Sequence, residues 1–236
     1  MLSRIALAFV SGLVLTASAT TAQAQVTSYT DAANDIDPTI GTGNGTLDIL
    51  GMEVSNTATD IVFRLTVNGN VGPGGTDWGK FMIGISTGGM PASNGNGWGR
   101  PINMNAPSGG MNYWIGSWVD GPGGAQLWNY TGSAWSGPAG LGGYTFAGNQ
   151  VTYTTSLASL GLSVGNTFFF DAYSSGGGGG DGAIDALANP NVSVTTWGGA
   201  YTSGGSNPIY SYTVVPAPGA VALLGLAGLI ARRRRR

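Results

Sequence analysis

Large apolar residues alternate with polar ones in several short stretches of the chain, most clearly at residues 61–67 and 81–85. A period of two is typical of a strand with one buried face. Runs of glycine, proline and asparagine, such as residues 120–124, separate these stretches and predict turns. The continuous apolar run at residues 167–173 predicts a central strand that is covered on both faces. The pattern therefore predicts an all-β fold.

The spacing of these strands favours a single antiparallel β-sandwich, either jelly-roll or immunoglobulin-like, over residues 25–213. Residues 156–162 predict one helical turn before the central strand. Residues 86–110 have no periodicity and predict a long connection, either functional or mobile. No internal repeat supports a propeller or a solenoid.

The composition narrows the possible chemistry. The chain contains 43 glycines but neither cysteine nor histidine. It therefore lacks a Ser-His-Asp triad, a Cys-His dyad and the usual zinc ligands. Residues 84–88 match the G-x-S-x-G pattern of a nucleophile elbow, but without a histidine base we interpret them as a turn. We predict that the protein is not an enzyme and has no cofactor, although its acids could bind Ca²⁺.

Charge is unevenly distributed. All eleven acidic residues lie between Asp31 and Asp185, whereas the basic residues of segment 25–213 are Arg64, Lys80 and Arg100, which gives this segment a net charge of −8. An acidic domain repels phosphate backbones, so nucleic acid is not an expected partner. Cations and neutral glycans suit it better.

The first 24 residues have the layout of a secretory signal peptide. Arg4 precedes an apolar run at residues 5–15, and the small residues Ala22 and Ala24 form an Ala-x-Ala site. We expect these residues to form an N-terminal signal helix that directs export of the protein, and we expect signal peptidase to cut after Ala24. A buried helix or a membrane anchor is the alternative.

The last 23 residues, 214–236, combine a proline motif, an apolar segment and a basic end. Pro216, Ala217 and Pro218 precede the apolar residues 219–231. Thirteen residues predict a helix of about 20 Å, shorter than the ~30 Å bilayer core. The positive-inside rule places the basic end on the cytoplasmic side. That end consists of Arg232, Arg233, Arg234, Arg235 and Arg236.

This arrangement resembles the PEP-CTERM sorting signal of exopolysaccharide-producing Gram-negative bacteria. The resemblance covers residues 215–236 and departs from the family pattern at Ala217, where glutamate is usual. It implies transient anchoring in the inner membrane, processing by an exosortase-like enzyme, and transfer to the cell surface or extracellular matrix. The departure leaves open which sorting enzyme acts, and an ordinary tail anchor is the alternative.

The middle segment resembles the DOMON-like and family 9 carbohydrate-binding-like sandwiches. The likeness is carried by LDILGMEVSNTATDIVFRLTV, then FMIGIST, then SLASLGL and FFFDAY, within residues 47–173. Such modules bind sugars, or in some branches haem, on a concave face or at loop ends. Without histidine, the haem variant is not expected here.

Indole rings stack on sugar rings, so tryptophans are the candidate glycan-binding residues. Trp114 and Trp118 share a parity along one predicted strand, and Trp98 lies in the long connection. Packing of most of these rings in the core is the alternative.

Two groups of acids could supply oxygen ligands to Ca²⁺, with solvated loop acids as the alternative. One group surrounds Asn34 and the other flanks the glycine run at residues 176–180. The groups are Asp31, Asp35 and Asp37, and Asp171, Asp181 and Asp185.

We therefore expect a non-catalytic, exported surface or matrix protein whose sandwich binds exopolysaccharide. An exported hydrolase that uses Asp pairs and a purely structural coat protein are the alternatives.

Overall fold

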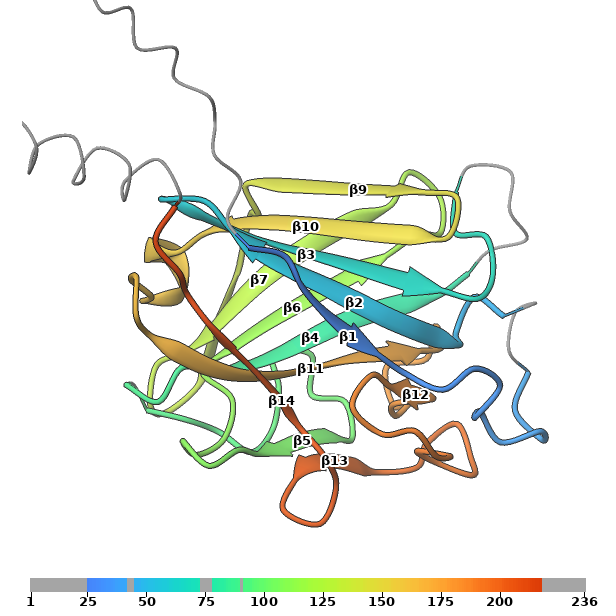
Figure 1. The fold of residues 1–236 in the computed structure, drawn as a ribbon. Helices are drawn as coiled ribbons and strands as arrows, with labels where there is room; N and C mark the ends of the chain where they lie inside the picture. The colour runs from blue at the N-terminus through green and yellow to red at the C-terminus, as the bar shows by residue number, and fades with distance from the viewer. Residues whose placement is uncertain (1–24, 42–44, 73–77, 90, 218–236) are drawn as a thin grey trace, which may run out of the picture.

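The computed structural model describes residues 25–41, 45–72, 78–89 and 91–217. Within them, two antiparallel sheets lie face to face (Figure 1). The predicted all-β class is confirmed. The predicted signal peptide with Ala22 and Ala24, and the segment from Pro218 through Arg236, lie outside the described residues.

The first sheet has five strands in the order β1-β2-β3-β10-β9, all paired antiparallel. In β3 every second residue is buried, as the alternation in its sequence predicts. The strands are β1 (Thr27–Thr30), β2 (Ile49–Asn56), β3 (Asp60–Val67), β9 (Gly143–Ala147) and β10 (Gln150–Ser156).

The second sheet has seven strands in the order β12-β11-β4-β6-β7-β8, with β14 also paired to β11. β11 is paired along both edges and buried over most of its length, which confirms the predicted central strand. A 3-10 turn, η1 (Ala158–Leu160), precedes it, as predicted. The strands are β4 (Lys80–Ser86), β6 (Tyr113–Trp118), β7 (Gly124–Tyr130), β8 (Trp135–Ala139), β11 (Thr167–Ser175), β12 (Asp185–Ala186) and β14 (Tyr210–Thr213).

The main hydrophobic core fills the space between the two sheets. The five-stranded sheet contributes Phe63 and Tyr153, and the seven-stranded sheet contributes Ile83, Ile115 and Phe170. Each of these side chains is fully buried, and burial of such a side chain contributes about 1.5–3 kcal/mol.

A second hydrophobic cluster covers the other face of the seven-stranded sheet. Met82, Trp114 and Tyr173 point to this side and are fully buried. They are covered partly by β5 (Ile102–Asn105) and β13 (Tyr201–Gly204), which pair in parallel. Residues 86–110 are thus more than a connection, because they contribute a strand and part of this packed layer. The parallel pair is also a departure from the predicted purely antiparallel fold.

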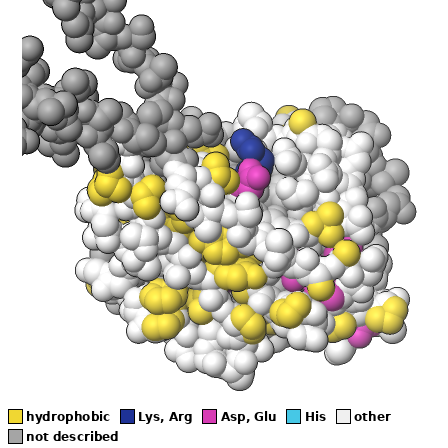
Figure 2. Space-filling view, in the orientation of Figure 1, with side chains coloured by type: hydrophobic (Ala, Val, Ile, Leu, Met, Phe, Trp, Pro, Cys, Tyr) yellow, Lys and Arg dark blue, Asp and Glu magenta, His cyan; other side chains and the backbone are white. Residues whose placement is uncertain are grey.

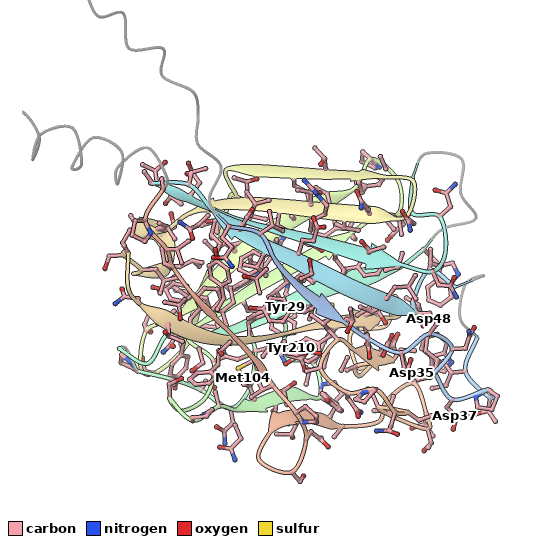
Figure 3. The ribbon with its side chains drawn as sticks, viewed as in Figure 1. Tyr29, Asp35, Asp37, Asp48, Met104 and Tyr210 are labelled. Carbon is pink, nitrogen blue, oxygen red and sulfur yellow. The ribbon has the colours of Figure 1, made fainter. Side chains whose placement is uncertain are left out.

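Two tyrosines join the sheets where β1 and β14 lie side by side (Figure 3). The Tyr29 hydroxyl donates to the Ser211 carbonyl at 2.6 Å, and the Tyr210 hydroxyl donates to the Thr30 carbonyl at 2.9 Å. The two rings lie 4.8 Å apart. These contacts tie an edge strand of the first sheet to a strand of the second.

Packing continues past residue 213. Val214 is buried in the main core, and the Asn56 side chain bonds both the N–H and the carbonyl of Val215. Pro216 is exposed and Ala217 partly exposed. The chain therefore leaves the sandwich at the position of the predicted sorting motif. Within the described residues, no helix has the length and hydropathy needed to cross a membrane.

Charged side chains are sparse on the face that Figure 2 shows. The outer side of the five-stranded sheet carries the Arg64–Glu53 ion pair, with a nitrogen–oxygen distance of 2.8 Å. Both side chains are more than two-fifths exposed, so this pair adds little stability.

Candidate functional site

A shallow pocket of about 270 Å³ lies at one end of the outward face of the seven-stranded sheet. Lys80 of β4 and Trp118 of β6 are cross-strand partners there. Trp98, Arg100 and Gly179 come from loops above the sheet and complete the lining. Two partly exposed indoles and two cationic groups thus surround one opening.

Two glycines allow the indoles to lie close to the sheet. A Cβ at Gly116 would collide with the ring of Trp98, and a Cβ at Gly124 would collide with the ring of Trp118. Gly124 faces Trp118 in the β6–β7 register. Any larger residue at either position would displace a ring that lines the pocket.

Polar contacts hold Trp98 in place. Its indole N–H donates to the Gln126 side-chain oxygen at 3.0 Å, and the Trp128 N–H donates to the same oxygen at 3.2 Å. The guanidinium carbon of Arg100 lies 5.5 Å from the centre of the Trp98 ring, within the range of a cation–π contact. A ring held on several sides is prepared for stacking on a ligand with little loss of entropy.

Arg100 is bound by neutral acceptors. Its guanidinium donates to the Ser175 hydroxyl at 2.7 Å and to the carbonyls of Gly176 and Asp181. Burial lowers its pKa, while the charge of Asp181 raises it. No carboxylate contacts the guanidinium within the described residues, so Arg100 contributes positive charge to the pocket. Lys80, by contrast, is paired with Asp120 at 2.5 Å.

The structure separates the three candidate tryptophans. Trp98 and Trp118 line the pocket, whereas Trp114 is fully buried. Trp114 does share the parity of Trp118, but its ring stacks on Tyr173 at 5.9 Å under the layer of β5 and β13. Trp114 is therefore not a surface residue, because its side of the sheet is covered there.

The structure brings together acids from both predicted groups, two from the first and one from the second. Carboxylate oxygens of Asp31, Asp35 and Asp185 lie within 4.8 Å of one another. Asp31 directly follows β1, Asp35 lies four residues further along, and Asp185 begins β12. The fold thus brings two acids from the first third of the described chain next to one from the last third.

Burial and mutual repulsion disfavour three negative charges at this cluster. Burial, and then the charge of Asp185, raises the pKa of Asp31 to about 9. Burial raises the pKa of Asp35 to about 6, with a further contribution from Asp48. Burial and the charge of Asp35 also raise the pKa of Asp185 well above its usual value. The cluster therefore favours protons or a cation.

The other three candidate acids lie apart from this cluster. Asp37 is held by Thr39, whose hydroxyl and N–H both donate to it, and these bonds lower its pKa. Asp171 is fully buried and accepts bonds from Ser203, Ala172 and Ala188. Asp181 accepts a bond from the Gly178 N–H and shapes the glycine loop. Each has a local structural role that accounts for it.

Sequence reasoning overlooked Arg100 and Lys80 as pocket residues. One signal was available, since segment 25–213 has only three basic residues and two of them line this pocket. Arg100 also lies two residues from Trp98, which the sequence did single out. Gln126 gave no comparable signal.

Comparisons with protein-family models, curated proteins and solved structures found no match to this chain.

Proposed function

We propose that the protein is a non-catalytic, exported surface or matrix component that binds polysaccharide at the pocket between Trp98 and Trp118. The observation that carries the proposal is the pairing of two partly exposed indoles with Arg100 and Lys80 around one opening. Indole faces suit the C–H surfaces of sugar rings, and cationic N–H groups suit hydroxyl or carboxylate oxygens. The proposed ligand is a chain of sugar rings.

The residues around the pocket disfavour the hydrolase alternative. A glycosidase usually places two carboxyl groups on either side of the bond that it cuts. Within the described residues, the pocket lining contains no carboxylate, and the nearby Asp120 is paired with Lys80. The lining therefore supports binding without cleavage.

Replacing Trp118 by alanine is expected to weaken glycan binding at least tenfold, because truncation of a central aromatic contact costs more than 1.4 kcal/mol. Isothermal titration of the purified protein with soluble neutral glucans and polyuronates, with calcium present throughout, measures this. Tighter binding of the polyuronate would indicate that Arg100 and Lys80 contact carboxylates.

Trp135→Ala is the matched control. Trp135 pairs with Tyr130 at the far end of β7, six residues or about 20 Å from Gly124 beside the pocket. Binding should survive in this variant. Equal affinities for wild type and Trp118→Ala, or no binding to any glycan by the folded protein, would contradict the proposal and favour a structural coat role.

We further propose that signal peptidase and an exosortase-like enzyme process the two ends, through a signal helix at residues 1–24 and a short membrane helix at residues 219–231. The sandwich itself is proposed to be jelly-roll or immunoglobulin-like. Anchoring in the inner membrane would be transient, before transfer to the surface or matrix. The exposed exit of the chain at Pro216 supports this proposal, because a protease must reach the Pro216–Pro218 motif.

Deletion of residues 219–236 is expected to release the protein unprocessed, because the apolar segment and the arginines that retain it are lost. Cell fractionation and intact mass measurement in an exosortase-containing host test this. Substitution of Arg64, a basic residue outside the signal, is the control. Unchanged localisation after the deletion, or a wild-type mass that still includes residues 219–236, would refute the sorting proposal.

A further inference from the structure

We propose that Asp31, Asp35 and Asp185 bind one calcium ion that joins the segment after β1 to β12. Their carboxylate oxygens lie within 4.8 Å of one another, which is the spacing of oxygens around a single cation. This site does not depend on the glycan pocket.

Three buried carboxylate oxygens of this cluster have no hydrogen-bond donor. Asp31 Oδ2, Asp35 Oδ1 and Asp35 Oδ2 are all buried and accept no hydrogen bond. Asp185 is only 1% exposed, and its oxygens accept bonds from the N–H groups of Ile49 and Ala186. Buried polar atoms are almost always paired, and a cation bound by these three oxygens would pair them.

No side chain of the described residues supplies that positive charge. Arg64 is paired with Glu53, Lys80 with Asp120, and Arg100 is bound by Ser175 and two carbonyls. These three are the basic residues of segment 25–213. Among the described residues no basic side chain neutralises the cluster, and a cation from solution would do so with its carboxylates ionised.

A further buried oxygen, the Tyr201 hydroxyl, is within electrostatic reach of two acids of the cluster. Tyr201 is only 3% exposed, and its hydroxyl makes no hydrogen bond. Burial raises the pKa of Tyr201, and the charges of Asp171, Asp185 and Asp31 raise it further. The Tyr201 hydroxyl thus adds one more buried oxygen without a hydrogen bond to those of Asp31 and Asp35.

The donor set identifies the ion as a hard cation. Every available ligand is oxygen, because the chain has no histidine or cysteine. Calcium accepts six to eight oxygens in flexible geometry, so carboxylates, backbone carbonyls and water can share the coordination, whereas Mg²⁺ demands a near-ideal octahedron. Ligands drawn from one loop and one short strand suit the less demanding ion.

The neighbouring contacts hold the loop in place. Both Asp48 carboxylate oxygens accept from the Asn34 N–H, at 3.0 and 3.2 Å, and one also accepts from Asn68. Figure 3 shows Asp35 and Asp48 near each other, with Asp37 further out along the same loop. Asp185 of β12 already accepts a bond from Ile49 of β2 in the other sheet. Because Asp31 follows the edge strand β1 and β12 is the edge strand of the second sheet, an ion here would join the edges of both sheets.

Calcium is expected to raise the melting temperature of the full chain by about 5–10 °C at a free concentration a hundredfold above its Kd. The measurement compares chelator, CaCl₂ and MgCl₂ in a thermal unfolding assay, and titration calorimetry with CaCl₂ should give one ion per chain. An equal shift with MgCl₂ would overturn the assignment to calcium. Because no glycan is present, failure of this test leaves the glycan pocket untouched.

Asp35→Asn should abolish the calcium shift without lowering the melting temperature in chelator, because both Asp35 oxygens accept no bond that the amide would break. Asp31→Asn should behave alike, since Asp31 Oδ1 can still accept from the Ala32 N–H. Asp37→Asn, in the same loop, should keep the full shift. No heat of binding in the calorimetric titration with millimolar CaCl₂ would overturn the site. A full calcium-induced rise in the melting temperature of Asp35→Asn would overturn it as well.

Discussion

Replacing Phe170 by alanine is expected to lower the free energy of unfolding by about 3–5 kcal/mol, the usual cost of deleting a buried phenyl ring. Phe170 is fully buried in the main core. Its ring contacts Phe63 of the opposite sheet at 6.0 Å and Tyr29 of β1 at 5.0 Å. The loss therefore weakens the contact between the two sheets as well as β11 itself. Denaturant unfolding followed by circular dichroism measures the change.

Phe169→Ala is the matched control, since it removes the same ring from the next residue of β11. Phe169 points to the other side of the sheet and is only partly buried, against the second cluster. Its loss should cost clearly less than that of Phe170. Equal costs for the two variants would mean that the inter-sheet core is not the main source of stability.

The alternating pattern predicted the buried strands well because local burial and local sequence agree there. The runs at residues 61–67, 81–85 and 167–173 became β3, β4 and β11, and the predicted turn became η1. By contrast, β5 has the sequence INMN within a glycine-rich segment, and it exists because β13 pairs with it from a hundred residues away. Such pairing leaves no local signal.

The candidate sites, like the strands, could be predicted only as far as the local sequence determines them. Parity placed Trp114 and Trp118 on one side of β6 but did not reveal that a second layer covers one and leaves the other partly open. The acids were grouped by sequence proximity, whereas the fold joins Asp31 and Asp35 to Asp185 through the position of β12. Residue types were thus predictable and their partners were not.

In the wild type, Asp171 is expected to lower the free energy of unfolding as the pH rises from about 4 to about 7. The variant Asp171→Asn should lack this contribution. Burial raises the pKa of Asp171 to about 7, although bonds from Ser203, Ala188 and Ala172 lower it. An unfolded aspartate has a pKa near 3.9, so the unfolded chain releases this proton first as the pH rises. The contribution of this group to stability is therefore complete below about pH 4 and lost by about pH 7.

The expected size of that fall is about 4 kcal/mol, from about three pKa units at 1.36 kcal/mol each. Asparagine cannot ionise in this range. The slope of the free energy of unfolding against pH should therefore differ between the wild type and the variant across this window, by an amount that corresponds to at most one bound proton. Its side-chain oxygen can still accept the N–H bonds of Ala172 and Ala188, which keeps the local structure. The free energy of unfolding, measured at half-unit pH steps in calcium-free buffer, gives both slopes.

The wild type and the variant both retain Asp31, Asp35 and Asp185, so their difference comes mainly from Asp171, whose charge also raises the pKa of Asp31. Asp37→Asn is the control, because the lowered pKa of Asp37 places its titration below the window. That variant should keep the wild-type slope. If Asp171→Asn also kept it, then Asp171 would be ionised in the folded protein throughout the range. The bonds from Ser203 and the two N–H groups would in that case outweigh the cost of burying its charge.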